Sequence, residues 1–316
     1  MDEGRVALIV NPTSGGGRGW RVLGEAAPLL RSHGLHPDVV VCTNGDEPAT
    51  LARQAVDAGH RRVVAVGGDG QAAAVANGLI GSDAALAVLP AGSANDYART
   101  IGIPRGNVAA AVETIAADNR ERVDTVRVSV ADGERHFLNV VGTGFDAVVA
   151  ARAERIPVLR GAGRYVLAIV AELPRFSAAT ITLTVDGERL QLRAMMVALA
   201  NGSTYGGGMR VAPSASLTSG RLEICIVGEL STVEFMRAFP RVFRGTHVDH
   251  PAVTMLSGRE VHIDADRPLR LIGDGDLFGQ LPATVAIRPA SLEVVVGPGF
   301  AVAADGPTPK VLRRPD

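Results

Sequence analysis

Residues 63–70 read VVAVGGDG, and this stretch decides the fold of the N-terminal half of the chain. The four apolar residues predict a buried strand, and the glycines after them predict a tight turn into a helix. The same pattern occurs at residues 86–95, LAVLPAGSAN, and at residues 6–15, VALIVNPTSG. Three such units predict a parallel sheet, because parallel strands are joined by helical crossovers. Ligands of such sheets bind at the carboxyl ends of the strands, where all three glycine turns would lie.

The order of apolar segments in the first part of the chain alternates between strand and helix patterns. Strands are expected at 5–10, 38–42, 63–66 and 85–89, and helices at 19–33, 47–58, 71–80, 95–101 and 107–118. This alternation predicts a doubly wound α/β domain with a parallel sheet over residues 1–123.

From residue 124 the pattern changes to strands with period-two alternation. They are expected at 125–130, 136–141, 178–185, 190–199, 222–227, 260–265, 269–272, 284–288 and 292–296. The sequences VADGE at 130–134 and VDGE at 185–188 predict hairpin turns. Two helical inserts are expected near 145–174 and 231–244. Residues 124–298 should therefore form a mainly antiparallel β domain.

The composition narrows the class of protein. The 316 residues are 47% hydrophobic, and the formal net charge of −1 argues against a nucleic-acid partner bound through a basic surface. Lys310 is the only lysine, which excludes a phosphate loop of the GxxxxGK type. Cys42 and Cys225 are expected to be buried, reduced thiols. The acidic start and the lack of a long uncharged apolar stretch predict a cytoplasmic protein, or one peripheral to a membrane.

The three glycine turns carry the candidate binding residues. Glycines permit positive φ angles and let backbone N–H groups approach an anion closely. Asp69 is placed to help hold Mg²⁺ or to orient phosphates, and Asp96 either binds the ligand or caps the helix that starts there. The remaining candidates for nucleotide binding are Asn11, Ser14, Gly15, Gly67, Gly68, Gly70, Gly92, Ser93 and Asn95. The turns therefore predict a site for a phosphate and a metal ion.

Several motifs, taken in order and spacing, resemble the diacylglycerol kinase-type lipid kinases. This family includes bacterial diacylglycerol kinases and their relatives among sphingosine and ceramide kinases. The matching pieces cover nearly the whole chain. They are NPTSG at 11–15, GGDG at 67–70, PAGSANDYAR at 90–99, GTGFDA at 142–147, NG at 201–202, YGGG at 205–208, APSA at 212–215, DGD at 274–276 and RPASLEV at 288–294.

The resemblance implies an NAD kinase-like α/β nucleotide-binding domain and a β-sandwich domain, with ATP and Mg²⁺ held between them. It also implies that residues 299–316 return to the first domain. Thr43, the loop Gly67–Gln71 and Ser93 would then contact the nucleotide. A lipid or lipid-like alcohol would be the acceptor, and the protein would be a homodimer. The general base of this family is a glutamate in an Asp-Gly-Glu motif, and Asp276 stands in its place.

Four departures from the family pattern bear on the site. Ser93 stands in place of the second loop's usual threonine and keeps the hydroxyl. Gln71 replaces a threonine of the phosphate loop and so removes one hydroxyl. Ser219 replaces the aspartate that binds a structural magnesium in bacterial members, which argues against that site at Ser216, Ser219 and Arg221. Asp276 is one methylene shorter than glutamate, and a misplacement of about 1 Å can lower a rate roughly a hundredfold.

The sequence thus predicts an ATP-dependent kinase that phosphorylates a hydroxyl of diacylglycerol or a related lipid, with Asp276 and Asp69 as the catalytic residues. Arg18 either neutralises the γ-phosphate or is a solvated arginine at a helix start. Asp276 either accepts the proton of the acceptor or is an ordinary turn aspartate. Two other functions stay open, a kinase of a non-lipid small molecule and a catalytically inactive nucleotide-binding regulator.

Two segments bear on the acceptor. Residues 233–244 read VEFMRAFPRVFR, which fits either a helix whose phenylalanines pack on the β domain or an interfacial segment with arginines on anionic headgroups. Residues 165–173 read YVLAIVAEL, which either line a lipid groove or belong to the core. Both alternatives are decided by which side chains are buried.

Overall fold

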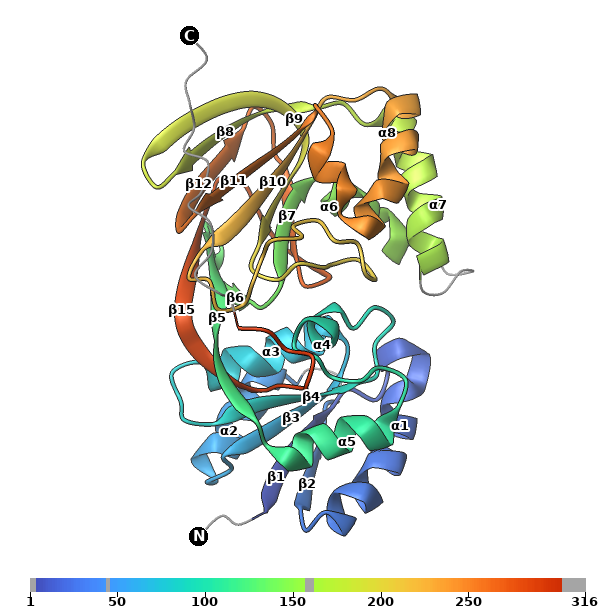
Figure 1. The fold of residues 1–316 in the computed structure, drawn as a ribbon, viewed down its shortest axis with the longest axis vertical. Coiled ribbons are helices and arrows are strands. Elements are labelled where there is room, and N and C mark those ends of the chain that lie inside the picture. The colour runs from blue at the N-terminus through green and yellow to red at the C-terminus, as the bar shows by residue number, and fades with distance from the viewer. Residues whose placement is uncertain (1–3, 44–45, 157–161, 303–316) are drawn as a thin grey trace. The chain divides into compact units, whose positions relative to one another are not determined.

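The computed structural model describes residues 4–43, 46–156 and 162–302 (Figure 1). It divides into two compact units, Met1–Val123 with Ala290–Val302, and Asp124–Pro289. The predicted return of the chain's last residues falls largely on 303–316, which lie outside the described residues. Each unit is described by itself.

The first unit has the predicted doubly wound α/β architecture. Its elements are β1 (Arg5–Val10), α1 (Ser14–Ser32), β2 (His36–Val41), α2 (Pro48–Asp57), β3 (Arg62–Gly67), α3 (Asp69–Leu79), β4 (Ala85–Pro90), α4 (Asp96–Thr100) and α5 (Val108–Ala117). The strands are parallel and lie in the order β4-β3-β1-β2. Glu293 and Val294 add a further parallel neighbour to β4. The carboxyl ends of β1, β3 and β4 therefore meet at one edge of the sheet.

The strands of this sheet are continuous apolar runs because helices cover them. Val63, Val64, Ala65 and Val66 are all fully buried. Helix α1 packs against α5, and α2 packs against α3. Burying each valine or leucine side chain stabilises the fold by about 1.5–3 kcal/mol, which is why such runs hold the sheet in place.

The second unit is mainly antiparallel. Its strands are β5 (Arg120–Val130), β6 (Gly133–Phe137), β7 (Val140–Gly144), β8 (Ala179–Val185), β9 (Glu188–Ala200), β10 (Leu222–Gly228), β11 (Val253–Gly258), β12 (Glu260–Ala265), β13 (Arg270–Gly273), β14 (Asp276–Gln280) and β15 (Ala283–Val295). Its helices are α6 (Phe145–Glu154), α7 (Ala162–Glu172), η1 (Leu173–Arg175), α8 (Thr232–Ala238), η2 (Phe239–Arg244) and η3 (Thr246–Asp249). Both predicted hairpin turns are present, joining β5 to β6 and β8 to β9.

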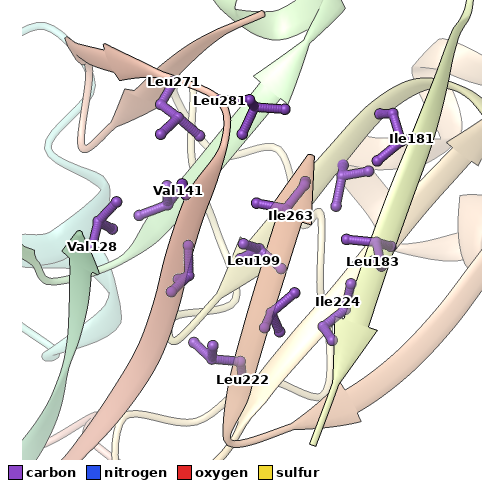
Figure 2. Packing of buried hydrophobic residues seen from close by; sticks show 14 of the residues in the cluster. Val128, Val141, Ile181, Leu183, Leu199, Leu222, Ile224, Ile263, Leu271 and Leu281 are labelled. Atoms are coloured by element: carbon purple, nitrogen blue, oxygen red, sulfur yellow. The ribbon is translucent and has the colours of Figure 1, made fainter. Parts of the chain in front are cut away.

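Strand β9 shows how the second unit buries both faces of its sheet. Val197 and Leu199 belong to one apolar core, together with residues of β8, β10 and β12 (Figure 2). Met196 and Ala198 point to the other face and belong to a second core, which α6, α7 and α8 cover. Side chains alternate between the faces of a strand, so one strand serves both cores.

The predicted strands differ from the observed ones at four places. The strand expected at 136–141 is broken at Leu138 and Asn139, because their N–H groups donate to the carboxylate of Asp274 instead of to a strand neighbour. The strands expected at 284–288 and 292–296 are one strand, β15, in which Ala290 has a φ of 48°. Strands β11 and β14 were not predicted. No helix in the described part of the chain is long and apolar enough to cross a bilayer.

Candidate functional site

The loops that follow β1, β3 and β4 meet at the edge of the first unit's sheet. The N–H groups of Ala91 and Gly92 donate to the carbonyl of Gly67 at 2.7 and 3.1 Å. Arg18 reaches from the first loop and donates through Nη2 to the carbonyl of Gly92 at 2.7 Å. These bonds bring together all three glycine turns that the sequence predicted to converge.

Glycine is required at two points of this convergence. A Cβ on Gly92 would lie 2.4 Å from the Cα of Gly68, closer than real Cβ contacts come. A Cβ on Gly15 would lie 2.2 Å from the carbonyl oxygen of Ala91, and Gly15 also has a φ of +60°. The loops therefore meet through bare backbone, and such a glycine cradle suits a phosphate group.

Asp69 fastens two of the loops to each other. It is the first residue of α3, and its Oδ1 accepts the N–H of Tyr97 in α4 at 2.8 Å. Burial raises the pKa of the Asp69 carboxyl, and the nearby Asp96 carboxylate raises it further. Asp96, the first residue of α4, forms an ion pair with Arg99. The N–H of Tyr97, in the first turn of α4, is bound by Asp69.

The polar side chains of the loops mostly brace the loops themselves. Asn95 has a φ of 53° and bonds the backbone of Gly92 twice, accepting its N–H and donating to its carbonyl, each at 2.9 Å. Asn11 Oδ1 accepts the N–H and the hydroxyl of Thr13. Ser93 Oγ lies 3.4 Å from Arg18 Nη2. Ser14 Oγ lies near Gly67, where a Cβ would come within 3.2 Å of it.

The side chains of Gln71 and Thr43 form their hydrogen bonds with groups outside the three glycine turns. Gln71 is buried, and its Nε2 donates to the carbonyl of Ile9 at 3.3 Å and lies 3.6 Å from the sulfur of Cys42. Thr43 donates through its N–H and its hydroxyl to Asp46 Oδ2, each at 2.7 Å. The Gln71 side chain thus points into the sheet, and Cys42 beside it is half-buried rather than buried as predicted.

Arg18 is not the solvated arginine that the sequence allowed. It is half-buried, and one guanidinium nitrogen is bound to Gly92 in the third loop. Its Nε is buried and has no hydrogen-bond partner within the described residues. A buried guanidinium N–H normally finds an acceptor, so the cradle presents an unsatisfied cationic donor that fits a phosphate oxygen.

In the second unit, Asp274 and Gly275 form the two-residue turn of the β13–β14 hairpin, with φ angles of 48° and 93°. Positive φ at both positions is the type I′ geometry that hairpins prefer. Asp274 is the turn aspartate, and its carboxylate accepts the N–H of Leu138 at 2.6 Å and of Asn139 at 2.9 Å. Asp276 is the first residue of β14, and 49% of its side chain is exposed. It pairs with Arg135 at 3.2 Å and comes directly after the two turn residues.

Asp146 is a further acid of the second unit, to which sequence analysis assigned no role. It lies in the first turn of α6, and this helix packs against β13 and β14. Its Oδ1 accepts the N–H of Ala147 at 2.8 Å, whereas Oδ2 is buried without a partner among the described residues. Burial raises the pKa of the Asp146 carboxyl to about 7. The signal in the sequence was an acid in an otherwise apolar run after two glycines, VVGTGFDAVVA at 140–150.

The loop that would hold the family's structural magnesium does not fit a metal ion. Ser219 Oγ donates to the carbonyls of Ser216 at 3.0 Å and Arg221 at 3.1 Å. Asp124 accepts the N–H of Gly220 at 2.6 Å. Across the described residues no three histidine, cysteine or acidic side chains gather as a metal site would need. Ser219 donates and Asp124 accepts the hydrogen bonds that close this loop.

Comparison with known proteins agrees with both units. The diacylglycerol kinase catalytic domain model matches residues 5–128, and the YegS C-terminal NAD kinase beta sandwich-like domain model matches residues 139–296. A diacylglycerol kinase of Mycobacterium tuberculosis is 33% identical over 296 residues, covering 92% of this chain and 95% of the relative. The chain belongs to the diacylglycerol kinase family. A Bacillus subtilis diacylglycerol kinase is 26% identical over 281 residues, covering 88% of this chain and 91% of that one.

Solved structures confirm the fold class of this diacylglycerol kinase family member. A putative diacylglycerol kinase from Bacillus anthracis superposes with a TM-score of 0.80 at 22% identity, covering 95% of this chain and 98% of that one. An NAD kinase from Archaeoglobus fulgidus, solved in complex with ATP, has a TM-score of 0.51 at 13% identity, with coverage of 92% and 93%. The α/β domain and the β-sandwich domain are therefore those of the diacylglycerol kinase and NAD kinase-like folds.

Proposed function

We propose that the protein transfers the γ-phosphate of ATP to a hydroxyl of diacylglycerol or a related lipid. The observation that carries this proposal is the convergence of three glycine turns around Gly67 and Gly92, in a chain of the diacylglycerol kinase family. Phosphoryl transfer depends mostly on positioning and on neutralising charge, which backbone N–H groups and an arginine supply.

In this proposal the first unit holds the phosphates. The backbone of the turns, with the hydroxyls of Ser14 and Ser93, binds phosphate oxygens, and the unsatisfied Nε of Arg18 supplies positive charge. Asn11, Thr43, Asn95 and the loop Gly67–Gln71 shape the nucleotide site around them. ATP with Mg²⁺ would supply the phosphoryl group and offset its charge. Asp69 positions α3 and α4 and is the carboxylate proposed to face the metal.

Asp276 is the proposed general base. Its carboxylate is half-exposed, so it can leave Arg135 and accept the proton of an acceptor hydroxyl. The turn beneath it is fixed by the bonds from Asp274 to Leu138 and Asn139, which hold the start of β14 in place. A short side chain on a fixed turn makes the position of the acceptor hydroxyl critical, because small displacements are costly in rate.

A kinase assay tests the proposal. The full-length protein is incubated with Mg²⁺, labelled ATP and separate acceptors, which are a short-chain diacylglycerol, a long-chain amino alcohol and glycerol, and products are identified by mass spectrometry. Phosphorylation of the diacylglycerol is the expected result. Transfer to glycerol alone would instead indicate a kinase of a small molecule, and nucleotide binding without any transfer would indicate an inactive regulator.

Nucleotide binding gives a second readout with a matched pair of variants. Gly92→Ala forces a Cβ to within 2.4 Å of Gly68 and should weaken ATP binding by about tenfold or more. Gly24→Ala places the same methyl group on α1, where no atom lies within 4 Å, and should leave binding unchanged. Equal affinities for the two variants would contradict the placement of the phosphates at the glycine cradle.

A further inference from the structure

The second unit carries two helical segments on one face of its sheet, and their inner sides are anchored by aromatic packing. Phe235 of α8 meets Phe145 of α6 at a ring distance of 5.2 Å, and Phe145 meets Phe176 after η1 at the same distance. Ile169 of α7 belongs to the same buried cluster. The core alternative for both segments is therefore correct for their inner sides. Helices α7 and α8 are fixed next to one apolar cluster (Figure 1).

The outer sides of these segments are also apolar, and nothing in the described chain covers them. Nine large hydrophobic side chains are exposed among the described residues, and six of these lie on α7 or on α8 and η2. Each of the six is at least 44% exposed; they are Val166, Leu167, Val170, Val233, Met236 and Phe243. We call these residues the α7–α8 surface. Exposed apolar groups concentrated in this way mark a surface that binds something.

The segment of α8 and η2, Thr232–Arg244, carries three arginines and one glutamate. Arg237, Arg241 and Arg244 are exposed, and none of them forms an ion pair with another described residue. The nearest acids of the same helices are engaged. Glu234 accepts from the N–H and the hydroxyl of Ser231 in a capping box, and Glu172 pairs with Arg152 at 3.5 Å. Asp249 of η3 is a further exposed acid.

We propose that the α7–α8 surface docks on the anionic surface of a phospholipid bilayer. The arginines would rest on lipid phosphates, and the six apolar side chains would enter the boundary between headgroups and acyl chains. This inference rests on the proposed lipid acceptor, because a long-chain diacylglycerol stays in the bilayer and the enzyme must reach it there. Unpaired arginines next to exposed aliphatic groups match an anionic bilayer in both charge and polarity.

Vesicle co-sedimentation without ATP tests the charge part of the proposal. The wild-type protein should bind vesicles of phosphatidylglycerol and should bind phosphatidylcholine vesicles far less. Salt at 0.5 M should release the protein, because salt screens the attraction and the Debye length falls to about 3 Å by 1 M. The triple variant Arg237→Gln, Arg241→Gln, Arg244→Gln should lose about a hundredfold in partition coefficient. The control variant Arg31→Gln, Arg53→Gln, Arg189→Gln removes three exposed arginines elsewhere and should bind like the wild type.

A second variant tests the apolar part. Val166→Ser, Leu167→Ser and Val170→Ser on α7 should lower the partition coefficient by about tenfold or more, because less apolar area enters the bilayer. Unchanged circular dichroism would show that the helix is intact. The docking proposal fails if wild type ignores phosphatidylglycerol vesicles, or if the arginine variant binds as well as its control.

The outcomes also separate this inference from the proposed function. Wild-type protein that phosphorylates a soluble short-chain diacylglycerol but does not bind vesicles overturns the docking surface alone. Protein that binds vesicles through this surface but phosphorylates no lipid overturns the lipid kinase proposal alone. Sedimentation velocity tests whether this surface instead binds a second copy of the chain. A wild-type dimer that dissociates in the α7 serine variant would show this and would overturn docking on a bilayer.

Discussion

Asp69 and Asp146 each lie where a strand leads into a helix, and we call these two turns the first and the second corner. The hydrogen-bond partners of the two acids differ. Each acid lies in the first turn of a helix that follows a strand, α3 in the first unit and α6 in the second. Burial raises the pKa of both carboxyls. Asp69 accepts an N–H from another element, at Tyr97, whereas Asp146 has one oxygen with no partner in the described chain. Burial alone therefore does not tell a bracing acid from an unsatisfied one; the partners do.

The second corner also differs in its neighbours. Helix α6 packs against the β13–β14 hairpin, which presents Asp276 half-exposed and paired with Arg135. The second corner thus combines an unsatisfied acid with an accessible one, while at the first corner Asp69 fastens α3 to α4. The proposed function gives a reactive role to the second unit and a positioning role to the first, and the following predictions test that division.

The largest expected effect is on catalysis at Asp276. Asp276→Asn should lower kcat by about 10²–10⁴-fold, the usual contribution of a general base. Stability should change little, since an exposed ion pair contributes about 0–1 kcal/mol. Asp132→Asn, an exposed turn aspartate of the β5–β6 hairpin, is the control. Asp276→Glu restores the family's side chain and should raise kcat. If Asp276→Asn keeps the wild-type kcat, Asp276 is not the general base.

The next effect is on the pH dependence of stability at Asp146. Its pKa of about 7 in the folded protein lies above the ordinary value of 3.8, so the folded state holds a proton that the unfolded chain releases. Stability should therefore fall as pH rises from about 4 to 7, by up to about 4 kcal/mol. Asp146→Asn should abolish that slope and be more stable than wild type at pH 8. Urea unfolding at pH 4, 6 and 8 measures this.

Asp132→Asn makes the same chemical change at an exposed position and should keep the wild-type slope. A wild-type protein whose unfolding free energy is flat between pH 4 and 7 would mean that the Asp146 carboxyl finds a partner in solution. That result would erase the difference between the two corners.

A smaller effect is expected at Asp69. Asp69→Ala leaves the buried N–H of Tyr97 without its acceptor and should destabilise the protein by about 1–3 kcal/mol. Asp69→Asn keeps an oxygen that can accept, so it should lose less. Asp83→Ala removes an exposed acid of the same unit, paired with Arg61 at 3.5 Å, and serves as the control. If thermal melts show the same loss of Tm for Asp69→Ala as for Asp83→Ala, Asp69 does not hold α3 and α4 together.

The smallest expected effect is that of metal removal in the absence of nucleotide. Because Ser219 and Asp124 close the Ser216–Arg221 loop by hydrogen bonds, a chelator should shift Tm by less than about 1 °C, well under the roughly 2–4 °C that 1 kcal/mol produces in a protein of this size class. Ser219→Asp, which restores the family's acid, is the matched variant and should gain stability from added Mg²⁺. A large chelator effect on the wild type would show a structural metal after all.

Much of the fold was predictable because its signals are local. The apolar run at 63–66 and the glycines after it fix a buried strand and a turn within eight residues, and the Asp-Gly pair at 186–187 fixes a hairpin in the same way. What escaped prediction is non-local. The break at Leu138 depends on Asp274, 136 residues further along the chain. Arg18 and Asp69 are recognisable as bracing groups only once Gly92 and Tyr97 are placed beside them.

Asp274 and Asp276 lie two residues apart in the β13–β14 hairpin and have different tasks. Asp274 holds the hairpin tip, and Asp276 is the proposed base. The Asp274 carboxylate fastens the hairpin tip to the gap between β6 and β7, so the tip keeps its shape whatever side chain stands at position 276. An aspartate there in place of a glutamate then alters the reach of the acid without disturbing its foundation. If Asp276 is the base as proposed, exchanging it for glutamate would change which acceptor hydroxyl the acid reaches, while the bonds of Asp274 would still hold the hairpin tip.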